Sequence, residues 1–182
     1  MKKTKDLVLT ALFVALIAAG AFLKIPLPGV PISLQTLFTM LAGMLLGAKL
    51  GALSVGVYIA LGLMGLPIFT SGGGITYVFQ PTFGYMIGFV LAAALTGWIS
   101  RKVERPGFVR LLLAGLAGTV VIYLCGTVYF YLISVFYLGK AVAIWPLVVS
   151  CMVTPLPGDI LKCVLGALLA RRLIPILDKD RV

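Results

Sequence analysis

The chain has 182 residues, of which 62% are hydrophobic and 11% are charged, and it contains no histidine. Soluble domains carry about 45–50% apolar and about 25% charged residues, so this composition excludes a soluble globular protein and indicates a membrane protein. A transmembrane helix needs roughly 20 residues, so the length accommodates about five to seven spans and no further catalytic domain. The net charge of +10 comes from Lys and Arg residues clustered between apolar runs. This pattern is typical of topology signals and contacts with anionic membrane lipid, and it does not indicate nucleic-acid binding.

The apolar runs predict an all-α integral membrane protein with six transmembrane helices. The spans lie at about residues 7–23, 33–48, 50–69, 81–100, 108–138 and 156–174. The first run also resembles a signal peptide, because three lysines precede it and Ala19–Ala21 resembles a cleavage site. Its length and the polytopic body that follows favour a retained helix. We expect residues 1–182 to form a single transmembrane domain.

The distribution of positive charge predicts the orientation of these helices. With the N-terminus inside, 12 Lys and Arg residues fall on the inner side, and only Lys24 and Lys140 fall on the outer side. Because positive residues accumulate in cytoplasmic loops, this asymmetry places both termini in the cytoplasm. We therefore expect a multi-pass protein of the cytoplasmic membrane.

The last apolar run, from Ala141 to Ile174, is longer than one span needs. Dividing it into two spans would place Arg171 and Arg172 on the same side as Lys24, against the charge rule. We therefore expect residues 141–154 to form an interfacial or re-entrant outer segment that is buried against the bundle.

Three of the expected helices begin on the outer side, and Pro or Gly residues precede each of them. These breaks are Pro26–Pro31, Gly72–Gly74 with Pro81, and Pro155–Gly158. The free amides at a helix N-terminus favour an anion or a polar ligand. Each break alone is equally typical of an ordinary loop between spans. The tetrapeptide Pro-Leu-Pro-Gly occurs in the first and third breaks, as paired interruptions do in many transporters, although so short a repeat also arises by chance.

Asp159 and Lys162 are the only charged residues between Lys140 and Arg171. Their i, i+3 spacing places both on one face of the last helix. Charged groups within a membrane segment are costly, face the protein interior and mark functional sites. The alternative is a structural pair in which Asp159 caps the helix and Lys162 neutralises it. A capping aspartate does not by itself require a lysine facing the bundle, so we favour a ligand site.

Few other polar residues lie near the outer helix ends. The further candidates for ligand binding are Gln35, Thr36, Gly74 and Tyr85. Aromatic residues between positions 123 and 137 gather in the outer half of the fifth helix, where an interfacial belt explains most of them. We expect one or two of these aromatic residues to contact a ligand.

Several kinds of chemistry are absent from the sequence. It has no P-loop for nucleotide binding, and without histidine it offers no Ser-His or Cys-His dyad and no zinc motif. Only one carboxylate lies within the bundle, whereas an intramembrane aspartyl protease needs two. We expect neither an enzyme nor a metal site.

Several segments of the sequence are characteristic of one known family. The most specific are VPISLQTLF at 30–38, LAGMLLG at 41–47 and Pro157-Gly158-Asp159 followed by Lys162. Segment GLPIF at 65–69 and the glycine run at 72–74 accompany them. In these segments the chain resembles the BioY family, the biotin-specific substrate-binding (S) components of energy-coupling factor transporters. The resemblance extends over nearly the whole chain.

The resemblance implies a six-helix membrane protein that binds biotin from the outside and needs no cofactor. It also implies partners, namely a coupling transmembrane subunit and a pair of ABC-type ATPases. An alanine motif on the first helix docks on the coupling subunit in this family, which favours Ala11 and Ala15. Asp159 and Lys162 become ligand residues, the loop containing Gly74 closes over the ligand, and Tyr85 forms part of the wall.

Three alternatives stay open at this point. The chain could be an S component for another vitamin, a self-sufficient facilitator or ion-coupled carrier, or a membrane scaffold without a ligand. The Asp-x-x-Lys spacing of the last helix argues against the first alternative. A transport assay without ATPases tests the self-sufficient carrier, and a measurement of biotin binding tests the scaffold.

Overall fold

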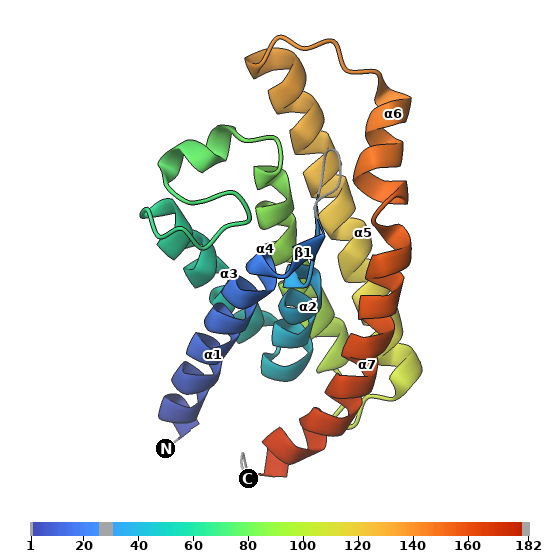
Figure 1. The fold of residues 1–182 in the computed structure, drawn as a ribbon. Helices are drawn as coiled ribbons and strands as arrows, with labels where there is room; N and C mark the ends of the chain where they lie inside the picture. The colour runs from blue at the N-terminus through green and yellow to red at the C-terminus, as the bar shows by residue number, and fades with distance from the viewer. Residues whose placement is uncertain (1, 26–30, 180–182) are drawn as a thin grey trace.

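The computed structural model describes residues 2–25 and 31–179, which form a bundle of helices (Figure 1). The α-helices are α1 (Lys2–Phe22), α2 (Gln35–Leu46), α3 (Ala48–Leu63), α4 (Phe83–Ser100), α5 (Phe108–Leu132), α6 (Ile144–Val148) and α7 (Leu156–Lys179). The shorter elements are strands β1 (Lys24–Ile25) and β2 (Ile32–Ser33), the 3-10 helix η1 (Ile75–Phe79), and the π-helical turns η2 (Ile133–Tyr137) and η3 (Val149–Val153). The first Pro-Leu-Pro-Gly sequence, at 26–29, lies outside the described residues.

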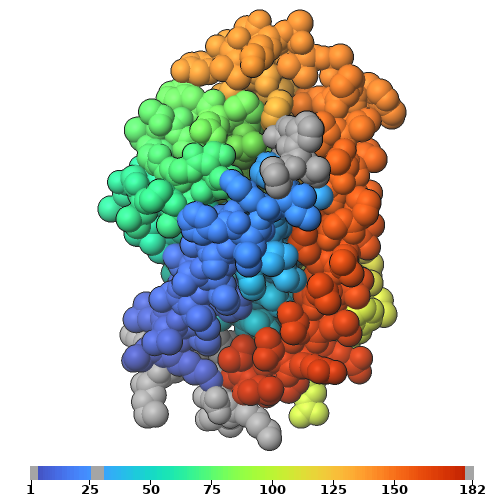
Figure 2. Space-filling model, viewed as in Figure 1, coloured from blue at the N-terminus to red at the C-terminus, as the bar shows by residue number. Residues whose placement is uncertain are grey.

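The predicted fold class, an all-α integral membrane protein with six long helices, is confirmed. Within the described residues, three stretches are long and apolar enough to cross a membrane, namely Thr4–Phe22, Phe83–Ser100 and Phe108–Tyr137. Helices α2 and α3 are shorter and apolar, and α7 carries the charged pair in its first half. Helix α1 begins and α7 ends at the same end of the bundle, as an even number of spans requires (Figure 1). The loop after α3 and the α5–α6 connection form the other end (Figure 2).

The second and third helices are shorter than the apolar runs that predicted them. Gly47 separates α2 from α3 with a φ of 87°, a backbone conformation that residues with a Cβ rarely adopt. Helix α3 ends at Leu63, whereas the apolar run continues to Phe69. Gly65 has a φ of 110°, and Pro67 follows, so the helix stops although the residues remain hydrophobic. Residues 64–82 therefore form a long loop that contains η1.

Helix α4 lies at the centre of the fold and packs against α2, α3 and α5. Its contact with α2 depends on Gly43, because a Cβ there would lie 2.2 Å from Thr96 Oγ1 and 2.3 Å from the Ala93 carbonyl oxygen. Gly97 allows the same closeness to the start of α3, where a Cβ would lie 2.4 Å from Ala48 N. Small residues at such crossings allow backbones to approach closely, which is how helices associate in lipid.

The segment before α7 agrees in part with the expectation of an interfacial or re-entrant outer segment buried against the bundle. Residues 144–153 are helical and run alongside the outer part of α5 (Figure 1). Leu147 and Cys151 are buried, but Ile144 and Trp145 are exposed. The expected burial against the bundle therefore holds for one face of the segment. One face packs against α5, and the other apolar residues lie on the outside, where a membrane protein also carries hydrophobic side chains.

Candidate ligand-binding site

A cavity of about 50 Å³ lies where the first turns of α2, α4 and α7 approach the middle of α5. Five of the six residues predicted to bind ligand line this cavity, namely Gln35, Thr36, Tyr85, Asp159 and Lys162. The three helix starts that the sequence assigned to the outer side therefore meet around one space. The apolar part of the wall includes Ile32, Met86, Phe89 and Ile122.

Asp159 and Lys162 form a buried ion pair at the cavity. The Lys162 ammonium contacts Asp159 Oδ1 and donates a 2.8 Å hydrogen bond to the backbone carbonyl of Ser33. Only 4% of Asp159 and 6% of Lys162 is exposed. Removing such charges from water costs several kcal/mol per ion, so the pair depends on good partners for both groups. Because Ser33 belongs to β2, Lys162 also connects α7 to the β1–β2 pair.

Tyr123 of α5 completes this network. Its hydroxyl donates a 2.6 Å hydrogen bond to Asp159 Oδ2, so both carboxylate oxygens have a donor. An N-cap would instead accept a hydrogen bond from a backbone amide of its own helix. Among the described residues, the Asp159 carboxylate contacts side chains of α5 and α7 and makes no hydrogen bond to such an amide. This arrangement does not match the capping alternative.

Gln35 is held by a second network behind the cavity. Its Nε2 donates a 2.7 Å hydrogen bond to the Tyr58 hydroxyl, which donates a 3.0 Å bond to the Ile68 carbonyl. Tyr58 is completely buried in α3. The amide that faces the cavity is thus fixed to the loop that follows α3.

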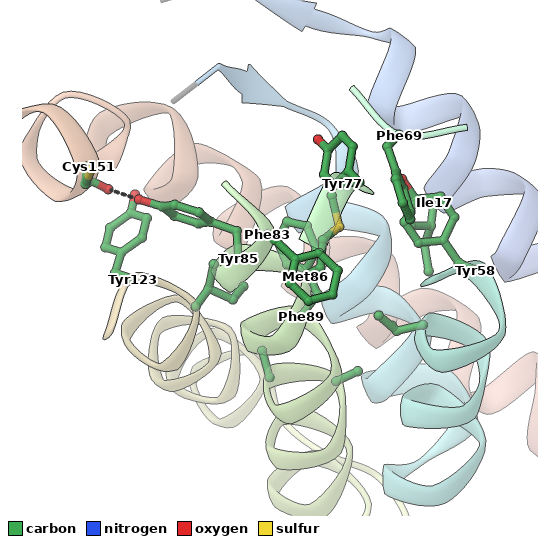
Figure 3. Close-up of a cluster of buried hydrophobic side chains, with 14 of the residues drawn as sticks. Ile17, Tyr58, Phe69, Tyr77, Phe83, Tyr85, Met86, Phe89, Tyr123 and Cys151 are labelled. Atoms are coloured by element: carbon green, nitrogen blue, oxygen red, sulfur yellow. Dashed lines mark hydrogen bonds between the residues drawn. The ribbon is translucent and has the colours of Figure 1, made fainter. Parts of the chain in front are cut away.

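Tyr85 connects the cavity wall to the irregular segment before α7. Its hydroxyl donates a 3.0 Å hydrogen bond to the Cys151 carbonyl in η3 (Figure 3). In a regular helix that carbonyl would accept from the residue four positions later, which is Pro155 and has no N–H. The proline therefore leaves an acceptor free inside the bundle, and Tyr85 satisfies it.

The loop after α3 and strand β1 lie on another side of the cavity. Thr70 lines the cavity, and its backbone carbonyl accepts a hydrogen bond from Lys24 of β1. The Thr70 hydroxyl lies 3.0 Å from the Tyr77 hydroxyl, and the Tyr77 ring packs on Phe69 at a centroid distance of 4.6 Å. The two segments are therefore joined to each other at the cavity.

Gly74, the sixth predicted ligand residue, does not line the cavity. It precedes η1, and its amide donates a 2.7 Å hydrogen bond to the Gly62 carbonyl at the end of α3. The glycine run shapes the loop, and Thr70 and Thr82 are the residues of that loop that reach the cavity. The predicted docking residues Ala11 and Ala15 lie apart from this site, exposed on α1.

The comparisons with known proteins agree with this geometry. The model of the BioY family matches residues 1–179. The chain belongs to the BioY family. It is 43% identical over 180 residues to the probable biotin transporter BioY of Lysinibacillus sphaericus, which covers 99% of this chain and 92% of that protein. It is 38% identical to the biotin transporter BioY of Thermotoga maritima, covering 93% of this chain and 95% of that protein.

A solved structure of an S-component for biotin from an ECF-type ABC transporter has the same fold. The TM-score is 0.82 at 32% sequence identity, and the match covers 94% of this chain and 92% of the other. The BioY-family assignment and the six-helix architecture therefore rest on both sequence and structure.

Two residues of the site networks were not singled out by the sequence, namely Tyr123 and Tyr58. Tyr123 belongs to a group of aromatic residues that a membrane-interface belt also explains. A signal was present, because Gly115, Gly118 and Gly126 mark the buried face of α5, and Tyr123 lies on that face. Small residues that face a neighbouring helix would have distinguished Tyr123 from exposed aromatic residues such as Phe136 and Tyr137.

Proposed function

We propose that this chain is the high-affinity biotin-binding subunit of an energy-coupling factor transporter and captures biotin at the outer face of the cytoplasmic membrane. The observation that carries the proposal is the buried Asp159–Lys162 pair, with Tyr123, at an otherwise apolar cavity. Membership of the BioY family supports biotin as the ligand. The whole chain, residues 1–182, acts as one six-helix domain.

The donors and acceptors of the site complement biotin. Biotin has a ureido ring with N–H donors and a carbonyl acceptor, an apolar sulfur ring and a carboxylate tail. Each Asp159 oxygen accepts one hydrogen bond from within the protein and has a further lone pair for a ureido N–H. Lys162 uses two of its donors internally and has another for a ligand oxygen. Met86 and Phe89 provide apolar contacts for the rings.

The cavity is too small for a bicyclic ligand as it stands, since about 50 Å³ corresponds to a few water molecules. We infer that biotin displaces the Lys162 ammonium from the Ser33 carbonyl and moves β2 away from α7. The Lys24 contact with the Thr70 carbonyl also links β1 to the neighbouring loop.

Transport requires energy that this chain does not supply. We propose that a coupling transmembrane subunit and a pair of ABC-type ATPases provide it, and that the exposed Ala11 and Ala15 of α1 contact the coupling subunit. ATP hydrolysis belongs to those partners, and this subunit is not an enzyme.

Isothermal titration of the purified chain with biotin tests the proposal. Desthiobiotin keeps the ureido N–H groups and the carboxylate, so we expect it to bind. An analogue with both ureido nitrogens methylated should bind at least 100-fold more weakly, because the buried acceptors would lack their donors. Equal affinity for the methylated analogue would contradict the assignment of Asp159. Tight binding of a different vitamin in place of biotin would indicate another S component.

A vesicle assay distinguishes the self-sufficient carrier from the proposed subunit. We expect biotin uptake into vesicles that contain this chain, the coupling subunit and the ATPases, and only background uptake with this chain alone. Full uptake by this chain alone would favour the facilitator.

A further inference from the structure

A second cavity, of about 270 Å³, lies at the end of the bundle where α7 ends and α5 begins. Its lining comes from the α4–α5 connection and from the last turns of α7. The lining residues are Arg105, Pro106, Gly107, Arg171, Ile174 and Pro175. None of these residues belongs to the biotin site.

Two arginines give this cavity a positive charge. Arg105 and Arg171 are exposed, and within the described residues neither side chain forms a hydrogen bond or an ion pair. Nearby arginines are different, since Arg101 pairs with Asp178 and Arg110 donates to the Ile99 carbonyl. An unpaired guanidinium has a planar set of donors suited to a phosphate group.

The start of α5 adds backbone donors to the same cavity. Gly107 precedes this 25-residue helix with extended backbone and no capping side chain. The first amides of a helix have no acceptor within the helix, so those of α5 are available to an anion. A Cβ on Gly107 would have no protein atom within 4 Å, so the space beside these amides is open.

The sequence explains why α7 leaves room at this position. Pro175 lies inside α7 and lacks the N–H that would bond to the Arg171 carbonyl. A proline within a helix produces a kink, and Figure 1 shows the last turns of α7 bending. Pro106 is buried and fixes the backbone before α5. Both prolines therefore shape the cavity that the arginines line.

We propose that this cavity binds the phosphate group of an anionic lipid headgroup. The two guanidinium groups and the α5 amides would contact the phosphate oxygens. The positive-inside pattern assigns this end to the cytoplasmic leaflet, whose anionic lipids attract basic residues. Val109 and Ile176, next to the cavity along α5 and α7, are exposed and apolar, as acyl-chain contacts require. A lipid is therefore favoured over a free phosphate ion.

Native mass spectrometry of the delipidated protein with phosphatidylglycerol or phosphatidylcholine tests this proposal. Arg105→Gln combined with Arg171→Gln should weaken phosphatidylglycerol binding at least tenfold. Phosphatidylcholine binding should change much less, because its choline cation offsets the phosphate charge and is repelled by the two arginines. The matched control is Lys49→Gln with Arg172→Gln, which removes the same charge from exposed residues outside the cavity. Equal loss in both double variants would show diffuse attraction and would overturn the proposal, as would no loss in either.

Substitutions of Gly107 provide an independent test that preserves the fold. Gly107→Asp adds a carboxylate that caps α5 and occupies the anion position, so lipid binding should fall at least tenfold while the protein becomes no less stable. Gly107→Ala leaves the amides free and should bind like the unmodified chain. Unchanged lipid binding by Gly107→Asp would refute the contribution of the helix start.

A titration with soluble anions distinguishes a lipid phosphate from a free phosphate ion as the ligand of this cavity. Inorganic phosphate and glycerol 3-phosphate are titrated into the protein in phosphatidylcholine nanodiscs, and the melting temperature is followed. We expect no specific shift below millimolar concentration, because these anions lack acyl chains. Two results together would overturn the assignment to lipid. They are a rise in melting temperature with a soluble anion below millimolar concentration that the Arg105/Arg171 variant abolishes, and a lack of phosphatidylglycerol binding by the unmodified protein.

Discussion

Replacing the two members of the Asp159–Lys162 pair, singly and together, distinguishes a ligand site from a structural ion pair. Asp159→Asn and Lys162→Met each remove one charge at nearly constant volume. Because 4% and 6% of these residues are exposed, the charge left behind stays buried and unpaired. Breaking a buried pair from one side costs about 3–5 kcal/mol, whereas replacing both partners is often close to neutral. The free energy of unfolding should therefore fall in each single variant and largely recover in the double variant.

Biotin affinity should behave differently from stability in this series. Losing a charged hydrogen-bond partner costs about 2–3 kcal/mol, which corresponds to a Kd about 30- to 150-fold higher. Stability should recover in the double variant but affinity should not, since both groups that are proposed to contact the ligand are then absent. Titration calorimetry measures the Kd, and thermal unfolding in the same detergent measures stability.

A second ion pair, also within the described residues, is the control. Arg101 and Asp178 join the end of α4 to the end of α7 through two 2.8 Å hydrogen bonds, far along the helices from the proposed biotin site. This pair is partly exposed, at 18% and 35% of the side chains. Arg101→Gln with Asp178→Asn should change stability by about 1 kcal/mol or less and leave the biotin Kd unchanged. Biotin binding by the Asp159/Lys162 double variant at the unmodified affinity would refute the reasoning.

Three further predictions concern the surroundings of the pair. Tyr123→Phe removes a donor to the Asp159 carboxylate, so the Kd measured by calorimetry should rise about tenfold with little loss of fold; an unchanged Kd would contradict this role. Tyr58→Phe leaves Gln35 Nε2 and the Ile68 carbonyl without their hydrogen-bond partner, so the free energy of unfolding should fall by about 1–3 kcal/mol. An unchanged thermal unfolding curve would contradict this role of the hydroxyl. Gly43→Ala adds a Cβ that has no space, so a smaller fraction of the protein should be monodisperse in size-exclusion chromatography. The control is Gly56→Ala, whose Cβ would have no atom within 4 Å, and its monodisperse fraction should equal that of the unmodified protein.

The sequence predicted those parts of the molecule that depend on local composition. The lengths of the apolar runs predicted the six long helices, and charged residues within an apolar run indicated Asp159 and Lys162 as site residues. Gln35 and Tyr85 also reach the same cavity, because each lies in the first turns of a helix that begins on one side of the membrane. Their contacts with biotin stay a prediction.

Other features depend on how one helix is rotated against another, and apolar periodicity does not specify this in a membrane. The helices are hydrophobic on lipid-facing and bundle-facing sides alike, so the hydrogen bond from Tyr123 to Asp159 was not predicted. The position of Tyr58 behind Gln35 depends on the packing of α3 against α2. The end of α3 at Leu63 was missed for a different reason, because hydropathy continues where Gly65 stops the helix.

The break before α7 explains how the charged pair comes to lie inside the bundle. The sequence suggested that Pro155–Gly158 mark a loop at the outer surface. In the structure α6 and η3 continue alongside α5 beyond this point, so α7 begins against other helices. Irregular backbone at such a position requires internal partners. Tyr85 satisfies the Cys151 carbonyl, and the amide of Asp159 donates to the Pro155 carbonyl. The interruption that would be costly in lipid therefore brings the first two turns of α7, with the Asp159 carboxylate and the Lys162 ammonium, to the cavity.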